Sequence, residues 1–101
     1  MGNCSSYNFK DLGQFDATKK PNVEIQYCGG WGYFSKANNF KQAILEVYPN
    51  AVINFKKDNG VTSNFNVRVN EKEVYNKKEN GNKFPECTKE LAEKIKNAVE
   101  N

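Results

Sequence analysis

The residues best suited to chemistry in this sequence lie at positions 27–33, which read YCGGWGY. Alternating apolar residues precede them and helical periodicity follows, so Cys28 is predicted to lie where a strand passes into a helix. Unpaired backbone N–H groups and the positive end of the helix dipole stabilise a thiolate at such a junction. Gly29, Gly30 and Gly32 allow a tight turn that brings amides close to the sulfur. We therefore interpret Cys28 as a candidate reactive thiol.

Two features leave the chemistry of this thiol open. Cysteine is among the most buried residue types, so Cys28 has the alternative of an inert cysteine at a strand end. A dithiol motif would also carry its second sulfur three residues later, where Trp31 stands. Cys87 is a candidate resolving thiol, with an incidental cysteine as the alternative. Tyr33 is expected to form a wall beside the loop.

Composition narrows the class of protein. A chain of 101 residues with 38% hydrophobic content forms one small domain. Its net charge of +3 comes from scattered lysines, so no nucleic-acid partner is expected. Three cysteines are a small and odd number, unlike the dense, even set of a disulfide-stapled secreted protein. The absence of histidine argues against a metal site. No apolar run spans a membrane and no secretory signal is present, which predicts a cytoplasmic protein.

The N-terminus carries a pattern for lipid attachment. The first six residues, MGNCSS, match the N-myristoylation pattern at Gly2, and Cys4 is a candidate palmitoylation site. Two acyl groups would hold the protein at a membrane surface, whereas one binds only marginally. The alternative is a leader that matches by chance. We interpret residues 1–22 as a tether that is partly packed through its three apolar residues, Phe9, Leu12 and Phe15.

Periodicity predicts the elements that carry the candidate site. Residues of strand type alternate between apolar and polar, and the helical segments repeat apolar residues every three or four positions. A proline after Tyr48 ends the first helix, and Thr88 is a candidate N-cap for the second. The predicted elements are a strand at 23–27, a helix at 35–47, a strand at 51–55, a hairpin built from 65–69 and 74–75, and a helix that follows Thr88.

The order β-α-β-β-β-α predicts an α/β (α+β) domain over residues 23–101, with two helices and a four-stranded mixed sheet. The first two strands must be parallel, because a helix connects them, and the following hairpin is antiparallel. This is a small thioredoxin-like arrangement. It brings the loop 60–64 and Cys87 to the edge of the sheet where Cys28 lies, and the loop is expected to contact a bound substrate.

The sequence resembles the selenoprotein W-like family, also called the Rdx family. The specific part of the likeness is the pattern YCGGxGY at 27–33 followed by Ser35-Lys36, and the resemblance extends over 23–99. It implies a thioredoxin-like fold and a thiol oxidoreductase linked to glutathione or peroxide handling, acting on glutathione or protein thiols and disulfides, with no bound cofactor. In the family pattern Cys28 matches the first cysteine, and Trp31 stands at the selenocysteine position.

Trp31 has two explanations. An indole cannot form a mixed disulfide, so the protein is either a redox-inactive member whose Trp31 packs as an aromatic lid, or a selenoprotein. In the second case Trp31 results from translating the selenocysteine codon UGA, which some genetic codes read as tryptophan. The first explanation makes the chain a membrane-tethered interaction or adapter domain. The second makes it an oxidoreductase with a Cys-x-x-selenocysteine loop at 28–31.

Overall fold

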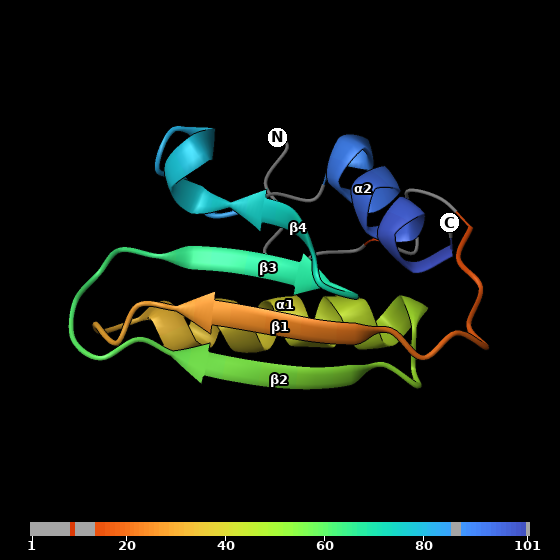
Figure 1. Cartoon of the computed structure of the whole chain (residues 1–101), viewed down its shortest axis with the longest axis horizontal. Coiled ribbons are helices and arrows are strands. Elements are labelled where there is room, and N and C mark those ends of the chain that lie inside the picture. Colours follow the sequence, from red (N-terminus) through yellow and green to blue (C-terminus); the bar gives the residue numbers. More distant parts are fainter. Residues whose placement is uncertain (1–8, 10–13, 86–87, 101) are drawn as a thin grey trace.

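The computed structural model describes residues 9, 14–85 and 88–100. Within them it contains a four-stranded sheet, two α-helices and one short 3-10 helix (Figure 1). The order β-α-β-β-β-α and the α+β class predicted from the sequence are confirmed, whereas the 3-10 helix was not predicted. The elements are β1 (Asn22–Tyr27), α1 (Tyr33–Val47), β2 (Val52–Lys57), β3 (Phe65–Val69), β4 (Lys72–Asn76), η2 (Lys77–Asn80) and α2 (Lys89–Glu100).

The sheet has the strand order β2-β1-β3-β4 and is mixed, as predicted. Strand β1 pairs in parallel with β2, with Val23 opposite Ile53, and antiparallel with β3, with Val23 opposite Val69. Because β1 lies between these two strands, the residues that follow it are flanked by the exit of β2 and the entry of β3. The segment 58–64, which joins β2 to β3, therefore closes over the C-terminal end of β1.

The two faces of the sheet differ in character. Val23 and Ile25 of β1 are buried, together with Phe40 of α1 and Ile95 of α2, so both helices cover the same face. Glu24, which lies between Val23 and Ile25 in the sequence, points to the opposite face of the sheet. There it forms ion pairs with Arg68 at 3.5 Å and with Lys56 at 4.0 Å. The period of two in β1 thus separates an apolar core from a charged open face.

Local signals explain where the helices begin and end. Helix α1 begins at Tyr33, two residues before the predicted start, after Gly32 in a left-handed conformation with φ +87°. It ends at Val47, before Tyr48 and the proline that follows. Helix α2 begins after Thr88, whose hydroxyl accepts the Leu91 N–H at 3.1 Å, which confirms the predicted N-cap.

Part of the segment before β1 packs on the domain. Phe9 is buried, and its ring lies edge-on to Phe40 with centroids 5.8 Å apart. The Phe15 ring contacts Tyr48 in the same manner at 5.5 Å. Leu12 lies outside the described residues. None of the helices in the described part of the chain is long and apolar enough to cross a membrane.

Candidate functional site

Cys28 directly follows β1 and is held in line with the strand. Its N–H donates to the Asn64 carbonyl at 2.9 Å, so the backbone pairing with the β3 side continues one residue beyond the strand. On the other side, the Asp58 N–H donates to the Tyr27 carbonyl at 2.8 Å. The Cys28 side chain has no exposed surface, at 0%. The thiol is therefore enclosed at the junction that the sequence predicts.

Two backbone amides converge on the Cys28 sulfur. The N–H groups of Gly30 and Thr62 each donate to Sγ at 3.2 Å. Burial raises the pKa of the Cys28 thiol. Hydrogen bonds from the amides of Gly30, Ser63 and Thr62 and from the Thr62 hydroxyl lower it, and together they outweigh burial, so the pKa of Cys28 lies below its ordinary value. An inert buried cysteine would have a raised pKa. Cys28 is buried, but its surroundings favour the thiolate.

The source of these donors differs from the prediction in one respect. Gly30 supplies one amide, as expected, but the others come from residues 62–63 and none of the donors belongs to α1. The sequence predicts that the loop 60–64 lies at this edge, in contact with a substrate. The amides of Thr62 and Ser63 in this loop face the sulfur, because the parallel β1–β2 pair and the antiparallel β1–β3 pair bring both ends of the loop to Cys28. The contact with a substrate stays a prediction.

Asp58 organises this loop from within. Its carboxylate accepts hydrogen bonds from the Thr62 hydroxyl, from Asn64 Nδ2 at 2.9 Å and from Gln26 Nε2 at 2.8 Å. The Thr62 bond is the largest cause that lowers the pKa of Asp58; partial burial opposes it, and the other two bonds add to the lowering. The net pKa of Asp58 lies below the usual carboxyl range. A charged Asp58 thus joins β1 to both arms of the loop.

Asp58→Asn is expected to lower the free energy of unfolding by about 1–2 kcal/mol at pH 7, because an amide turns a donor toward groups that also donate. The folded pKa of Asp58 is depressed, so its contribution is present above the unfolded pKa of about 4 and is lost as pH falls through the folded value. Urea denaturation at pH 7 and in acid measures this. The exposed Glu79→Gln, with the same charge change, is the control, and an equal loss in both variants would contradict the role of Asp58.

The backbone of Gly29 lies so close to this loop that no residue with a side chain would fit at this position. Its N–H donates to the Gly60 carbonyl at 2.9 Å. A Cβ at this position would lie 2.7 Å from the Asp58 carbonyl oxygen and 2.8 Å from that of Gly60. Both contacts are with backbone, which cannot turn aside as a side chain can. The predicted need for glycine here is explained by close approach.

Trp31 lies outside this enclosure. Its side chain is 99% exposed, so the prediction of an aromatic lid is wrong. Phe34 and Val61 are also exposed, and Val61 lies at the Cys28 end of the sheet, since its Cγ2 would be 3.6 Å from a Cβ on Gly30. We call Trp31, Phe34 and Val61 the apolar rim. The selenocysteine position of the family pattern is therefore the most accessible side chain near the buried thiol.

The remaining predicted site residues divide into two groups. Tyr33 begins α1, and its ring packs on Phe84 with centroids 5.1 Å apart. Cys87, Gly2 and Cys4 lie outside the described residues, so the resolving thiol and the acylation stay predictions. In the described part of the chain, no group of three or more histidine, cysteine or acidic residues is arranged to bind a metal ion.

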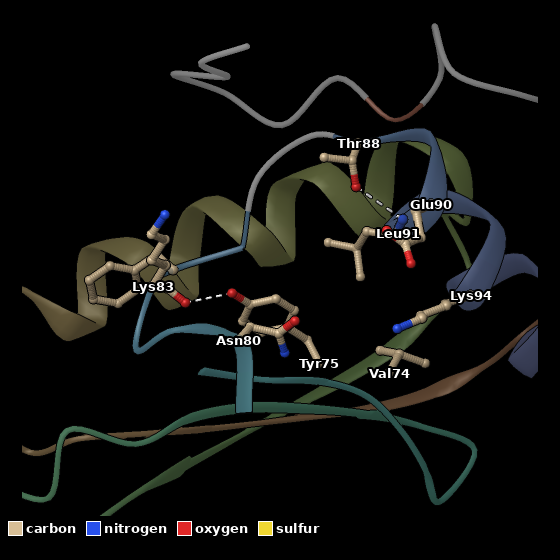
Figure 2. Close-up of a pocket in the computed structure, with 9 residues that line it drawn as sticks. Val74, Tyr75, Asn80, Lys83, Thr88, Glu90, Leu91 and Lys94 are labelled. Carbon is tan, nitrogen blue, oxygen red and sulfur yellow. Dashed lines mark hydrogen bonds between the residues drawn. The ribbon is translucent and has the colours of Figure 1, made fainter. Parts of the chain in front are cut away.

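A cavity of about 230 Å³ lies elsewhere, between β4, η2 and α2 (Figure 2). Tyr75 and Lys83 face it, joined by a bond from the Tyr75 hydroxyl to the Lys83 carbonyl, and Lys94 of α2 points in from the opposite side. Neither Cys28 nor the segment 58–64 lines this cavity. The candidate site is thus a surface loop over a buried sulfur and does not depend on the cavity.

Comparisons with known proteins agree with the fold described above. The model of the Rdx family matches residues 22–97. Among solved structures, a selenoprotein W-related protein from Vibrio cholerae is similar in fold, with a TM-score of 0.66 and 21% identity over 77% of this chain and 95% of that one. No curated protein sequence matches significantly. The predicted thioredoxin-like fold is confirmed by this structural likeness.

Proposed function

The chain belongs to the Rdx family, and we propose that it is a thiol/selenol redox protein whose reacting pair stands at positions 28 and 31. The observation that carries the proposal is the Cys28 sulfur, which is buried yet receives the N–H groups of Gly30 and Thr62. Such donors stabilise a thiolate more than a thiol. A strand-end cysteine with no chemical role would not need them.

Accessibility divides the roles of the two positions. Position 31 is fully exposed and Cys28 is enclosed, so the group at 31 meets an external oxidant first and Cys28 reacts second. A selenolate at 31 would attack a peroxide ROOH, giving a selenenic acid and, after protonation, the alcohol ROH. The Cys28 thiolate would then attack selenium and displace hydroxide, which takes a proton from solvent to leave as water, and a selenenylsulfide would close. Two glutathione thiols would reduce this bond, restoring both groups and yielding glutathione disulfide.

This mechanism requires selenocysteine at position 31, because an indole has no sulfur or selenium to oxidise. The exposure of Trp31 supports that assignment. Trp is rarely left in solvent, since burial of its large ring is favourable, and the described aromatic pairs include none with Trp31. A small ionised selenol fits a fully exposed site far better. We propose that residue 31 is native selenocysteine encoded by UGA.

Protein from the natural source is expected to contain one selenium atom per chain and to reduce peroxide or a disulfide in a glutathione-coupled assay. Intact mass, selenium analysis and the codon of residue 31 in the transcript establish the identity of that residue. Turnover establishes the activity. A UGG codon together with no turnover above the rate of glutathione alone would refute the oxidoreductase.

The second candidate function is a redox-inactive interaction domain of the same fold. The apolar rim favours it, because all three of its large apolar side chains are exposed, and exposed apolar surface is often used for binding. The two candidates make different predictions for selenium-free protein with Trp31. An interaction domain would bind its partner in that form, and reduction or oxidation of Cys28 would leave binding unchanged.

A further inference from the structure

Lys77 is a buried cation that the proposed mechanism does not use. It lies at the start of η2 with only 4% of its surface exposed, although lysine is almost never enclosed without a partner. Its Nζ donates to Asn82 Oδ1 at 2.9 Å and to the Ser63 carbonyl at 3.4 Å. The second acceptor belongs to the loop that encloses Cys28.

Two aromatic rings complete the environment of this ammonium group. Lys77 Nζ lies 5.6 Å from the centre of the Tyr33 ring and 5.3 Å from that of Phe84. Both rings therefore offer a cation–π contact, which is worth most where water is excluded. Within the described part of the chain, the ion pairs do not include Lys77, so its charge is balanced by carbonyl oxygens and ring faces. Lys77 thus joins η2, α1 and the 58–64 loop at one point.

Ser63 connects Lys77 to the surroundings of the Cys28 sulfur. It has a left-handed backbone with φ +62°, which an ordinary L residue adopts only where its surroundings hold it. Its carbonyl accepts from Lys77, and the N–H of the same peptide, on Asn64, donates to the Thr62 hydroxyl at 3.3 Å. Both ends of that peptide are therefore held. The preceding amides, on Thr62 and Ser63, are those that face Cys28.

We infer that Lys77 is a positioning residue, which holds the Ser63 peptide against η2 and so keeps the amides of residues 62–63 directed at the Cys28 sulfur. The inference rests on the proposed function, since it takes Cys28 to react as a thiolate. The other titratable groups of this assembly are Asp58, inside the loop, Tyr33, under the ammonium group, and Lys36 of α1, whose Nζ lies 5.3 Å from the centre of the Phe84 ring. None of these three contacts the sulfur in a described hydrogen bond.

Lys77→Met tests the inference, because methionine is also unbranched, only one atom shorter, and packs on the two rings without donating to Ser63. The thiolate absorbance of Cys28, taken as the difference from the Cys28→Ser protein, is followed against pH. The midpoint is expected to rise by about 0.5–1 unit. This rise lowers the alkylation rate of Cys28 below the midpoint by about 2- to 4-fold, because the smaller thiolate fraction is partly offset by the higher nucleophilicity of the thiolate. Lys78→Met, an exposed neighbour with the same charge change, should leave the midpoint unchanged.

The alkylation rate well above the midpoint separates positioning from general loosening. Loosening would expose Cys28 and raise that limiting rate by about 10-fold or more. Loss of the amides raises it only by about 1.5- to 3-fold, because a thiolate of higher pKa is a somewhat better nucleophile. An unshifted Lys77→Met profile, equal shifts in both lysine variants, or a limiting rate raised by about 10-fold or more would each overturn the inference. If Lys77→Met does not fold, Asn82→Gly, which keeps the left-handed φ of +60° at an exposed position, should shift the midpoint in the same direction. An ordinary midpoint in the unaltered protein would instead refute the Cys28 thiolate of the proposed function.

Discussion

Trp31→Cys is expected to create a redox-active protein, with turnover in a glutathione-coupled assay at least about 100-fold above that of the Trp31 protein. The exposed position 31 then carries a thiol, and the enclosed Cys28, with its pKa already lowered, lies three residues before it. Mild oxidation should close a disulfide between positions 28 and 31, which peptide mapping detects. The recombinant variant needs no selenium, so it tests the site independently of the codon.

Two control variants separate the sulfur chemistry from the loss of the indole. Trp31→Ser removes the same apolar surface and adds no sulfur, so it should be inactive. The double variant Trp31→Cys, Cys28→Ser should react once with peroxide to give a sulfenic acid at position 31. It should then depend on glutathione to reduce that sulfenic acid. Should Trp31→Cys form no crosslink to position 28 and show no turnover, the pairing of these two positions would be wrong.

Gly29→Ala is expected to lower the free energy of unfolding by about 2–4 kcal/mol, because the added methyl group has no space. Its Cβ would lie within 2.8 Å of two backbone carbonyl oxygens, those of Asp58 and Gly60. Relief requires the 58–64 loop to move, and that movement would also withdraw the amide of Thr62 from the sulfur. Urea denaturation measures the loss.

Gly60→Ala is the matched control from the same loop. A Cβ there would meet nothing within 4 Å, but the backbone has φ +92°. Its cost should therefore be the conformational strain alone, about 1–2 kcal/mol. Equal losses in the two variants would show that backbone conformation, and not close packing against Gly29, governs this turn.

The fold could be predicted because its signals are local. The alternation of Val23 and Ile25 with polar residues, the proline after Tyr48 and the hydroxyl of Thr88 each act within a few residues of the structure they determine. The position of Cys28 followed from the same signals. The start of α1 was displaced by two residues, because Gly32 begins the helix without a side-chain cap that a sequence pattern would reveal.

The donors around the sulfur could not be predicted, since they depend on contacts between distant segments. The loop 58–64 has no periodicity, and its shape is set by Asp58 binding Gln26 from another strand. Lys77 appears in the sequence as one of many lysines, and its burial results from the meeting of η2, α1 and the loop. Sequence patterns identify the reacting residue more readily than the residues that tune it.

The buried ring of Phe9 also limits how far the domain can stand from a membrane. Phe9 is fixed in the core against Phe40, so only the residues before it can act as a spacer. Six residues lie between Gly2 and Phe9, and the seven Cα–Cα steps between them reach about 25 Å in a fully extended chain. An acyl group on Gly2 would therefore confine the domain to a shell no deeper than its own diameter above the lipid surface. Groups at the lipid surface would then lie within reach of the tethered domain.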